Sequence, residues 1–350
     1  MKAVVYHGPY DVSVETVPDP TIENPGDVIV KIVAAGVCGS DLWTYRGQAN
    51  VAAEARIGHE FLGVVAELGA EVSTLQVGDW VVSPFRYSDG TCEFCTTGLP
   101  SSCVNGGFWG REAHDAGQGE LVRVPFADGT LVKIGDADSA PSKQLIPGLL
   151  TLSDVMPTGW HAATRAGVSQ GSTAVIVGDG AVGQCAVISA RRLGAERIIV
   201  LGGQHSDRSA LAMQLGATDF LSERGDEAVA AVRDLVGAAA VDHVVECVGT
   251  AGSFDTALQL ARPGSTVGYV GLPHGVVIDL ARLFGRNIGI AGGVAPARAY
   301  IPNLISDVLA GAIDPGAVFT AVMSLSEAAL AYQMMDERST IKAMLSVSAP

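Results

Sequence analysis

Three of the six cysteines of this 350-residue chain lie in one short segment, SDGTCEFCTTGLPSSC, at residues 88–103. Cys92 and Cys95 are separated by two residues, and Cys103 follows after seven more. Thiolates at such spacings are typical zinc ligands, and a structural zinc site needs four ligands. The segment therefore predicts a zinc site that lacks one cysteine, and it raises the question of which residue supplies the fourth ligand.

A glycine-rich turn is the second candidate site. The sequence VGDGAVG places Gly178, Gly180 and Gly183 in G-x-G-x-x-G spacing, after the apolar run TAVIV and before a segment with helical periodicity. This order is the dinucleotide-binding fingerprint, in which pyrophosphate approaches the unpaired N–H groups at the start of the helix. The turn predicts a bound dinucleotide, and the alternative is a turn that only serves packing.

The end of the next strand decides between NAD and NADP in such folds. An acidic residue about twenty positions after the turn binds the adenosine ribose hydroxyls of NAD. Here the strand RIIVL continues into GGQHSDR, with Gly202 in the place of the acid. The missing carboxylate favours NADP(H), because nothing there repels a 2′-phosphate, and NAD(H) is the alternative, with Asp207 reaching the ribose. The cofactor contacts expected at this end are Gly202, Gly203, Gln204, His205 and Arg208.

Two kinds of segment must position these groups. Up to about residue 152, short Val/Ile-rich runs bounded by Gly, Pro, Asn or Asp predict strands of a barrel-like domain: KAVVY, DVIVKIVAAGV, FLGVVAEL and DWVVSP. Beyond it, the strand-like runs TAVIV, RIIVL, DHVVECVG and STVGYVG alternate with helical patterns, which predicts a parallel, doubly wound α/β sheet. The closing run IKAMLSV is expected to return to the first domain.

The composition excludes several classes of protein. Hydrophobic residues make up 48% and charged residues 17%, which indicates a compact globular chain. A net charge of -15 without a Lys/Arg cluster argues against a nucleic-acid partner. No apolar run reaches the roughly 18 residues of a membrane span, and the N-terminal run is too short for a secretory signal. We expect a cytoplasmic protein whose cysteines are thiols or metal ligands.

Cys38 in GVCGSDLW, His59 and Glu60 in GHE, and Asp154 in LSDVMPTGWH complete the set of motifs. Together with the cysteine-rich segment, VGDGAVG and VGLP, they stand in the order found in the zinc-dependent alcohol dehydrogenases of the medium-chain dehydrogenase/reductase superfamily. The sequence resembles this family over nearly its whole length. The resemblance implies a GroES-like β-rich catalytic domain at residues 1–152 and 291–350, a Rossmann domain at 153–290, and a homotetramer.

The resemblance also implies two zinc sites. Cys38, His59 and Asp154 would hold a catalytic zinc, with Glu60 as a supporting or exchangeable ligand. Three protein ligands leave an open position for the substrate oxygen, where zinc favours loss of hydride to the nicotinamide. Taken alone, Asp154 also suits a helix cap. The second site is the cysteine-rich segment at residues 88–103, which we call the lobe. Cys92, Cys95 and Cys103 match the second to fourth cysteines of a structural zinc site in the family, and Asp89 matches the first. The alternative is a lobe that has lost its zinc.

Further roles follow from the same resemblance. Ser40 matches the hydroxyl that starts the proton relay, but the relay histidine is Trp43 here, whose indole cannot carry a proton at neutral pH. Asp41 is expected to be a buried hydrogen-bonding support. The remaining expected cofactor contacts are Val182 in the turn, Thr158 beside the nicotinamide, Val270 and Leu272 near its carboxamide, and Lys342 at the pyrophosphate, for which an ordinary surface lysine is the alternative.

The expected substrate pocket is aromatic. Trp43, Phe85, Phe108 and Trp109 match positions that line or border the family's pocket, which suits hydrophobic alcohols, ketones and aldehydes as small-molecule substrates. A polyol or sugar dehydrogenase is the alternative, with polar groups from Arg111, Glu112 and His114.

A protein of another class, one that binds a cofactor without turnover, would have no use for an open zinc site. The presence of Cys38, Ser40, His59 and Asp154 therefore argues against it.

Overall fold

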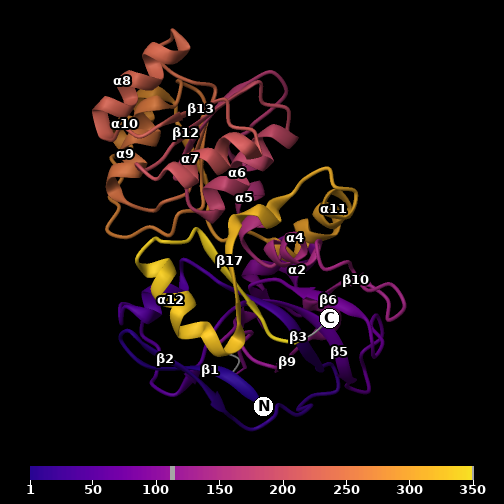
Figure 1. The fold of residues 1–350 in the computed structure, drawn as a ribbon. Coiled ribbons are helices and arrows are strands. Elements are labelled where there is room, and N and C mark those ends of the chain that lie inside the picture. Colours follow the sequence, from indigo (N-terminus) through magenta and orange to yellow (C-terminus); the bar gives the residue numbers. More distant parts are fainter. Residues whose placement is uncertain (111–114, 349–350) are drawn as a thin grey trace. The chain divides into compact units, whose positions relative to one another are not determined.

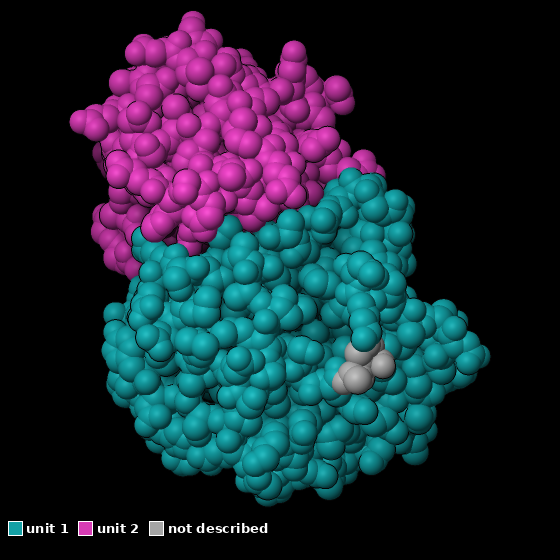
Figure 2. All heavy atoms as spheres, viewed as in Figure 1, with its two compact units in different colours: residues 1–154, 296–350 teal, residues 155–295 magenta. Residues whose placement is uncertain are grey.

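The computed structural model describes residues 1–110 and 115–348. The chain forms two compact units, which Figure 2 shows in different colours. Unit 1 comprises Met1–Asp154 and Pro296–Pro350, and unit 2 comprises Val155–Ala295. The boundaries thus fall at 154/155 and 295/296, where the sequence analysis expected 152/153 and 290/291.

Unit 1 is built on sheets, as its short apolar runs predict, and its strand pairs are antiparallel except for the parallel pair of β17 and β18 (Figure 1). The main sheet has the order β10-β6-β5-β3-β18-β17, with β9 also pairing with β3. In the central strand β3, every residue except Lys31 is buried. These strands are β3 (Val28–Val37), β5 (Glu60–Leu68), β6 (Trp80–Ser83), β9 (Leu121–Val124), β10 (Val132–Gly135), β17 (Phe319–Ser324) and β18 (Lys342–Ser346). β18, which contains most of IKAMLSV, pairs antiparallel with β3.

Smaller elements complete unit 1. A three-stranded sheet has the order β2-β1-β4, and β7 pairs with β8. The strands are β1 (Lys2–Gly8), β2 (Asp11–Thr16), β4 (Ala55–Arg56), β7 (Arg86–Tyr87) and β8 (Gly107–Phe108). The helices are α1 (Asp41–Tyr45), α2 (Glu93–Thr96), α3 (Ala127–Thr130), α4 (Ile146–Thr151), α11 (Ala297–Leu309) and α12 (Ala328–Asp336), with short 3₁₀ turns η1 (Pro100–Ser102), η2 (Pro315–Val318) and η3 (Leu325–Glu327).

Unit 2 is the predicted parallel sheet, with the strand order β13-β12-β11-β14-β15-β16. The first strand of the unit, β11, lies between β12 and β14, so the strand order reverses there, which is where such folds bind nucleotides. The strands are β11 (Thr173–Val177), β12 (Arg197–Leu201), β13 (Asp219–Leu221), β14 (His243–Glu246), β15 (Thr266–Tyr269) and β16 (Gly289–Gly292). The helices are α5 (Val155–Arg165), α6 (Ala181–Arg192), α7 (Ser206–Leu215), α8 (Gly225–Val236), α9 (Ala251–Leu260) and α10 (Leu280–Arg286).

Helices cover both faces of this sheet, because alternate strand residues point to opposite faces. On one face, Val175 and Val267 share a core with residues of α8 and α9. On the other face, Gly268 lies against α5, where a Cβ atom would be 2.1 Å from the carbonyl oxygen of Ala162. A sheet buried on both faces explains why its strands are continuous apolar runs.

Across residues 1–110 and 115–348, none of the helices combines the length and the apolar character needed to span a lipid bilayer.

Candidate metal and cofactor sites

Four side chains that can bind a metal meet in unit 1. Cys38 directly follows β3, His59 and Glu60 stand at the start of β5, and Asp154 is the residue before α5. β3 and β5 pair antiparallel with Gly36 opposite Glu60, so the end of one strand lies beside the start of the other. One ligand atom from each of the four residues lies within 4.8 Å of the others.

The distances within this cluster suit a single tetrahedral ion. Cys38 Sγ lies 3.4 Å from Asp154 Oδ2, and His59 Nε2 lies 3.2 Å from the same oxygen. Zinc bonds of about 2.0 to 2.3 Å place tetrahedral ligand atoms roughly 3.3 to 3.8 Å apart. The three residues expected to bind the catalytic zinc are therefore spaced as its ligands would be.

Asp41 orients two of these ligands. Its Oδ2 accepts a hydrogen bond from the Cys38 N–H (2.9 Å), and its Oδ1 lies 3.1 Å from His59 Nδ1. A carboxylate on one ring nitrogen of a histidine leaves the other nitrogen, here Nε2, to face the metal. Asp41 is thus the buried support that the sequence analysis expected.

Glu60 is fully buried, and only one of its two carboxylate oxygens has a hydrogen-bond partner among the described residues. Its Oε1 accepts a hydrogen bond from Lys342 Nζ (2.7 Å), whereas Oε2 has no hydrogen-bond partner among the described residues. A Cβ atom at Gly36 would lie 2.0 Å from Oε2, so this glycine leaves the space that Glu60 occupies. A buried oxygen without a donor is costly, and a metal ion in the adjacent cluster would compensate it. This orphan atom shows that the donor set fits a cation.

The structure corrects the expectations for Lys342. Its side chain is 1% exposed, so the alternative of a surface lysine is wrong. Its ammonium donates to Glu60 and to the carbonyl oxygen of Val37, because β18 pairs with β3 at this point. Lys342 is therefore engaged inside unit 1, and its contact with a cofactor pyrophosphate stays a prediction.

The negative charges of this cluster, which would attract a cation, also act on its thiol and imidazole. Burial and the charge of Asp154 raise the pKa of Cys38. Burial alone would lower the pKa of His59, but Asp41 and Asp154 outweigh it and hold this pKa well above its ordinary value. Both groups thus retain a proton that a divalent cation would displace on binding.

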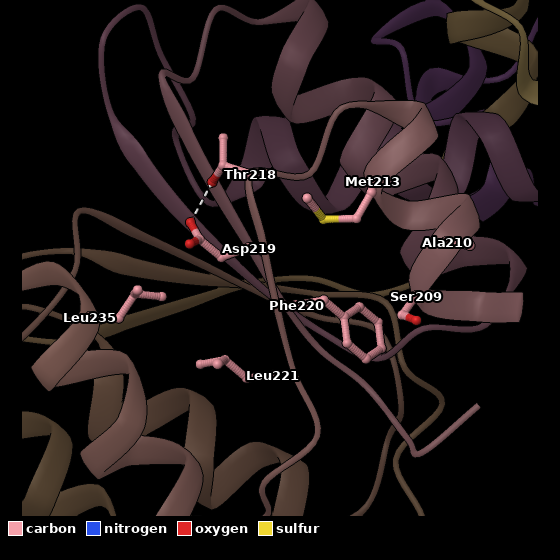
Figure 3. Close-up of a pocket in the computed structure, with 8 residues that line it drawn as sticks. All are labelled: Ser209, Ala210, Met213, Thr218, Asp219, Phe220, Leu221 and Leu235. Atoms are coloured by element: carbon pink, nitrogen blue, oxygen red, sulfur yellow. Dashed lines mark hydrogen bonds between the residues drawn. The ribbon is translucent and has the colours of Figure 1, made fainter. Parts of the chain in front are cut away.

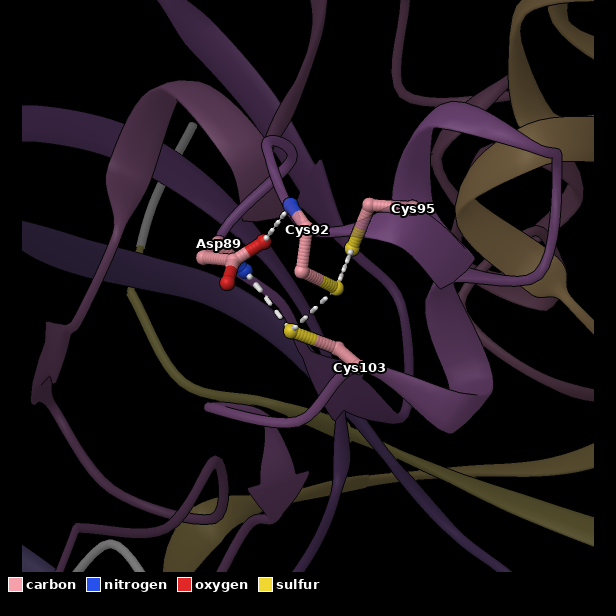
Figure 4. Close-up of side chains that lie close together, drawn as sticks. All are labelled: Asp89, Cys92, Cys95 and Cys103. Carbon is pink, nitrogen blue, oxygen red and sulfur yellow. Dashed lines mark hydrogen bonds between the residues drawn. The ribbon is translucent and has the colours of Figure 1, made fainter.

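Asp89 completes the second cluster, which Figure 4 shows. Cys92 Sγ lies 3.5 Å from Cys95 Sγ and 3.8 Å from Cys103 Sγ, the separations expected for thiolates on one zinc ion. Asp89 Oδ1 accepts hydrogen bonds from the N–H groups of Thr91 and Cys92 (2.8 and 2.9 Å). An oxygen of Asp89 and the three sulfur atoms all lie within 4.8 Å of one another.

Hydrogen bonds keep the Asp89 carboxylate ionised. Burial would raise its pKa, but the N–H groups of Cys92 and Thr91 and the amide of Asn105 (2.7 Å from Oδ2) lower it below its usual range. Among the thiols, the N–H groups of Cys95 and Val104 lower the pKa of Cys92, whereas burial is the main cause that raises the pKa of Cys95 to about 12. Asn105 has no spacing signal in the sequence, and only the structure shows its contact with Asp89.

The three glycines of the turn between β11 and α6 have the three roles that a dinucleotide site requires. Gly178 has φ +117°, a conformation that favours glycine. At Gly180, the residue before α6, a Cβ atom would meet nothing within 4 Å, so the space above the helix start is open. At Gly183 a Cβ atom would lie 2.0 Å from the carbonyl oxygen of Gly178, so only glycine lets the helix approach the strand. The turn is a cradle that fits a pyrophosphate.

The expectation of NADP(H) rested on the absence of a carboxylate at the end of β12, and the structure corrects this point. A Cβ atom at Gly202 would lie 2.8 Å from Asp179 Oδ2, and the N–H of Gly203 donates to that oxygen (2.7 Å). Arg208, which is buried, pairs with the other carboxylate oxygen at 3.5 Å. A carboxylate does stand at the end of β12, supplied by the turn instead of the strand. Asp179 lies inside the G-x-G motif, but nothing in the sequence shows that its side chain reaches the end of β12.

The other expected cofactor residues lie in unit 2. Val182 is in the first turn of α6, and Thr158 is in α5. Val270 and Leu272 follow β15 at the carboxyl edge of the parallel sheet, the edge at which the glycine turn also lies. Gln204 is exposed in its loop, as is the next residue, His205.

The aromatic residues of the expected pocket divide into two groups. Trp109 is 4% exposed, packs edge-on against Phe61 at 5.1 Å, and donates from Nε1 to the Pro84 carbonyl oxygen, so it belongs to the core of unit 1. Phe85 and Phe108 stack at 5.9 Å, and the Phe85 N–H donates to the carbonyl oxygen of Ser153.

This last hydrogen bond places the Phe85–Phe108 pair beside the segment that carries Asp154. Ser40 is exposed at the start of α1, and Trp43 lies within that helix. Arg111, Glu112 and His114, the polar groups of the alternative pocket, lie outside the described residues.

Known proteins resemble both units. Residues 24–136 match the alcohol dehydrogenase GroES-like domain, and residues 181–310 match the zinc-binding dehydrogenase family. Zinc-type alcohol dehydrogenase B of Aspergillus flavus is 33% identical over 96% of this chain and 79% of its own length. A probable zinc-binding alcohol dehydrogenase of Mycobacterium tuberculosis is 35% identical over 97% of this chain and 86% of its own. Among solved structures, alcohol dehydrogenase TADH from Thermus sp. ATN1 is 30% identical with a TM-score of 0.91, covering 99% of this chain and 100% of that one.

Proposed function

The chain belongs to the zinc-dependent alcohol dehydrogenases of the medium-chain dehydrogenase/reductase superfamily, and we propose that it interconverts hydrophobic or aromatic alcohols with ketones or aldehydes. Hydride would pass between the substrate and a nicotinamide dinucleotide. The observation that carries this proposal is the spacing of Cys38, His59 and Asp154, which suits one tetrahedral metal ion.

Each residue of the cluster has a distinct task in this proposal. Cys38, His59 and Asp154 would hold the catalytic zinc, which when bound supplies Lewis acidity toward the substrate oxygen. Asp41 fixes the orientation of Cys38 and His59 through the contacts given above. Ser40, exposed and two residues from Cys38, is suited to take the proton of the substrate hydroxyl. Since Trp43 cannot carry that proton further, we expect it to pass from Ser40 to water.

The aromatic pair supports a preference for hydrophobic substrates. Phe85 and Phe108 are stacked, and the guanidinium of Arg86 lies 4.6 Å from the centre of the Phe108 ring. Phe85 is held by its backbone next to Asp154. A pocket bordered by such rings favours apolar groups over polyols, which need several polar partners.

We further propose that Asp89, Cys92, Cys95 and Cys103 hold a structural zinc ion. Four ligands without an open position serve folding and not chemistry. The support is the three-sulfur spacing together with an ionised carboxylate at the position of the missing cysteine.

The cofactor would bind along the glycine turn of unit 2. The preference for NADP(H) that was expected from Gly202 loses its main support, because Asp179 fills that position with a carboxylate. All six cysteines are free thiols, and four of them lie in the two candidate metal clusters. We therefore also propose a cytoplasmic location.

Self-association, as a homotetramer by family resemblance, is a further part of the proposal. Val277, Leu280 and Phe284 are 92%, 74% and 87% exposed, and they lie on or just before α10. The next strand, β16, is an edge strand of the sheet in unit 2. Apolar side chains so exposed beside an open strand edge fit a second copy of this chain.

Metal counting combined with two matched variants tests the proposal. Elemental analysis of protein purified without added metal or chelator should give two zinc ions per subunit. Cys38→Ala should retain one zinc, lose oxidation of NADH or NADPH in the presence of an aryl ketone, and still bind the dinucleotide, whose turn lies in the other unit. Asp89→Ala should lose the lobe zinc and thermal stability while the remaining folded enzyme keeps its turnover.

Two outcomes would refute these assignments. Turnover by Cys38→Ala at the wild-type rate would remove the catalytic zinc site from this cluster. Loss of turnover by Asp89→Ala with both zinc ions still bound would show that the lobe is not structural.

A further inference from the structure

The carboxylate of Asp179 lies at the end of the second strand of the sheet, where this kind of fold usually has an acidic residue of the strand itself. The acid that binds the ribose of NAD normally comes from the end of the second strand, which here is β12 and ends at Leu201. The next residue is Gly202, and the Cβ position of this glycine lies 2.8 Å from Asp179 Oδ2. Asp179 itself belongs to the turn after β11, so it reaches this position from the neighbouring strand.

Two side chains, those of Phe220 and Asp179, occupy the space beside Gly202 into which an acidic side chain at this position would extend. Phe220 Cζ lies only 2.2 Å from the Cβ position of Gly202. The same ring lines a surface hollow formed by α7, β13 and α8, together with Ser209, Met213 and Leu235 (Figure 3). A side chain at residue 202 would have to displace the far end of the Phe220 ring, whereas Asp179 already places a carboxylate there.

Asp179 is held in place on both oxygens. Oδ2 accepts a hydrogen bond from the N–H of Gly203 (2.7 Å), and Oδ1 lies 3.5 Å from a terminal nitrogen of Arg208. Arg208 is 9% exposed, and its Nε has no hydrogen-bond partner among the described residues. The carboxylate and the guanidinium therefore have fixed positions beside the end of β12.

We propose that Asp179 replaces the missing acid of the second strand, that it accepts a hydrogen bond from the adenosine 2′-hydroxyl of NAD(H), and that it thereby discriminates against NADP(H). This inference rests on the proposed function, because it requires a dinucleotide along the glycine turn.

The chemistry of the Asp179 carboxylate matches a hydroxyl. A ribose hydroxyl can donate a hydrogen bond to the carboxylate of Asp179. A 2′-phosphate has only acceptor oxygens at neutral pH and carries negative charge. Next to Asp179 it would lose a hydrogen bond and meet a like charge, and both effects weaken the binding of NADP(H).

Arg224 is the group that acts in the opposite direction. One of its terminal nitrogens lies 3.5 Å from the Cβ position of Gly203, and the residue is exposed. Its guanidinium has no hydrogen bond or ion pair with the described residues, so it is available to a phosphate. Because solvent screens an exposed charge more than the partly buried one of Asp179, we expect Asp179 to dominate in the wild type. Removing the Asp179 charge should leave Arg208 and Arg224 facing the 2′-position together.

The test measures the dissociation constants of NADH and NADPH with zinc-loaded protein and no substrate, by nicotinamide fluorescence. The wild type should bind NADH more tightly than NADPH. Asp179→Asn keeps an acceptor for the Gly203 N–H but removes the charge. It should weaken the binding of NADH and strengthen the binding of NADPH, so that the ratio of their dissociation constants changes about tenfold or more.

Asp242→Asn is the matched control, because Asp242 also accepts a backbone N–H (Thr173, 3.0 Å) and pairs with an arginine (Arg262, 2.7 Å). Asp242 precedes β14, at the opposite end of the sheet, so this variant should leave the ratio unchanged.

A second measurement uses the wild-type protein and so does not depend on how the variants fold. An NADH analogue without the adenosine 2′-hydroxyl, 2′-deoxy-NADH, should bind about tenfold more weakly than NADH. Tighter binding of NADPH than of NADH by the wild type, or equal binding of NADH and its 2′-deoxy analogue, would overturn the role of Asp179 while the dinucleotide site stands. Failure to bind either NADH or NADPH would overturn the proposed function and this inference with it.

Discussion

At the scale of single residues, the ion pair between Lys342 and Glu60 shows how the metal cluster is supported. The side chains are 1% and 0% exposed, and the contact measures 2.7 Å. Burial lowers the pKa of Lys342, but Glu60 and the nearby Cys38 outweigh it and raise this pKa above its usual value. The ammonium thus remains charged at neutral pH and holds Glu60 beside the metal-binding residues.

Removal of this ammonium should destabilise the protein strongly. Lys342→Met leaves Glu60 as a buried charge without its partner, which costs about 3 to 5 kcal/mol of unfolding free energy. Arg262→Met is the control, since the pair of Arg262 with Asp242 is 59% and 38% exposed and such pairs contribute at most about 1 kcal/mol. Urea denaturation of both variants measures the difference, and equal losses would show that burial gives Lys342 no special weight.

At the scale of elements, two adjacent strands position each site. In unit 1, the antiparallel pairing of β3 with β5 brings Cys38 to His59 and Glu60. In unit 2, the parallel pairing of β11 with β12 brings the glycine turn to the end of the second strand, with Val177 opposite Leu201. In both cases the chemistry lies just beyond strand ends, where side chains are no longer needed for the sheet.

The open space above the start of α6 can be tested with a methyl group. Gly180→Ala should fold normally, because its Cβ atom meets nothing within 4 Å. It should nevertheless weaken dinucleotide binding about tenfold or more, since the methyl group enters the pyrophosphate cradle. Gly252→Ala in α9 is the control, also with nothing within 4 Å, and should change unfolding free energy by at most about 1 kcal/mol and binding not at all. Calorimetric titration with NADH distinguishes the two, and unchanged affinity in Gly180→Ala would move the dinucleotide away from this turn.

At the scale of the whole molecule, the exposed apolar residues of α10 and the segment before it are the strongest sign of self-association. Leu280 and Phe284 lie one turn apart on the same helix face. Their exposure of 74% and 87% is unfavourable in water unless another surface covers them.

Charged residues on this face of α10 should weaken the proposed self-association. Leu280→Glu together with Phe284→Glu is expected to shift the mass measured by light scattering to a smaller species, because a buried carboxylate without a partner opposes association. Val77→Glu is the control, since Val77 is 60% exposed in unit 1. An unchanged mass of the double variant would place the interface elsewhere.

The sequence by itself determined the local part of this protein. The strands of both units and the turn into α6 follow from short apolar runs and glycine spacing, because a strand or a turn depends on residues that are neighbours in the chain. The same holds for the cysteine spacing of the lobe. The resemblance added Cys38, His59, Asp154 and Asp89, and the structure brings them into two clusters.

Only the tertiary structure decided what surrounds each side chain. Asp179 meets Gly203, 24 residues away, so the carboxylate that seemed to be missing from the second strand is present. Lys342 meets Glu60 across 282 residues and is buried instead of exposed. Trp109 packs in the core of unit 1, edge-on against Phe61. Residue type and spacing cannot reveal such neighbours, because burial and charge pairing depend on which distant segments the fold places side by side.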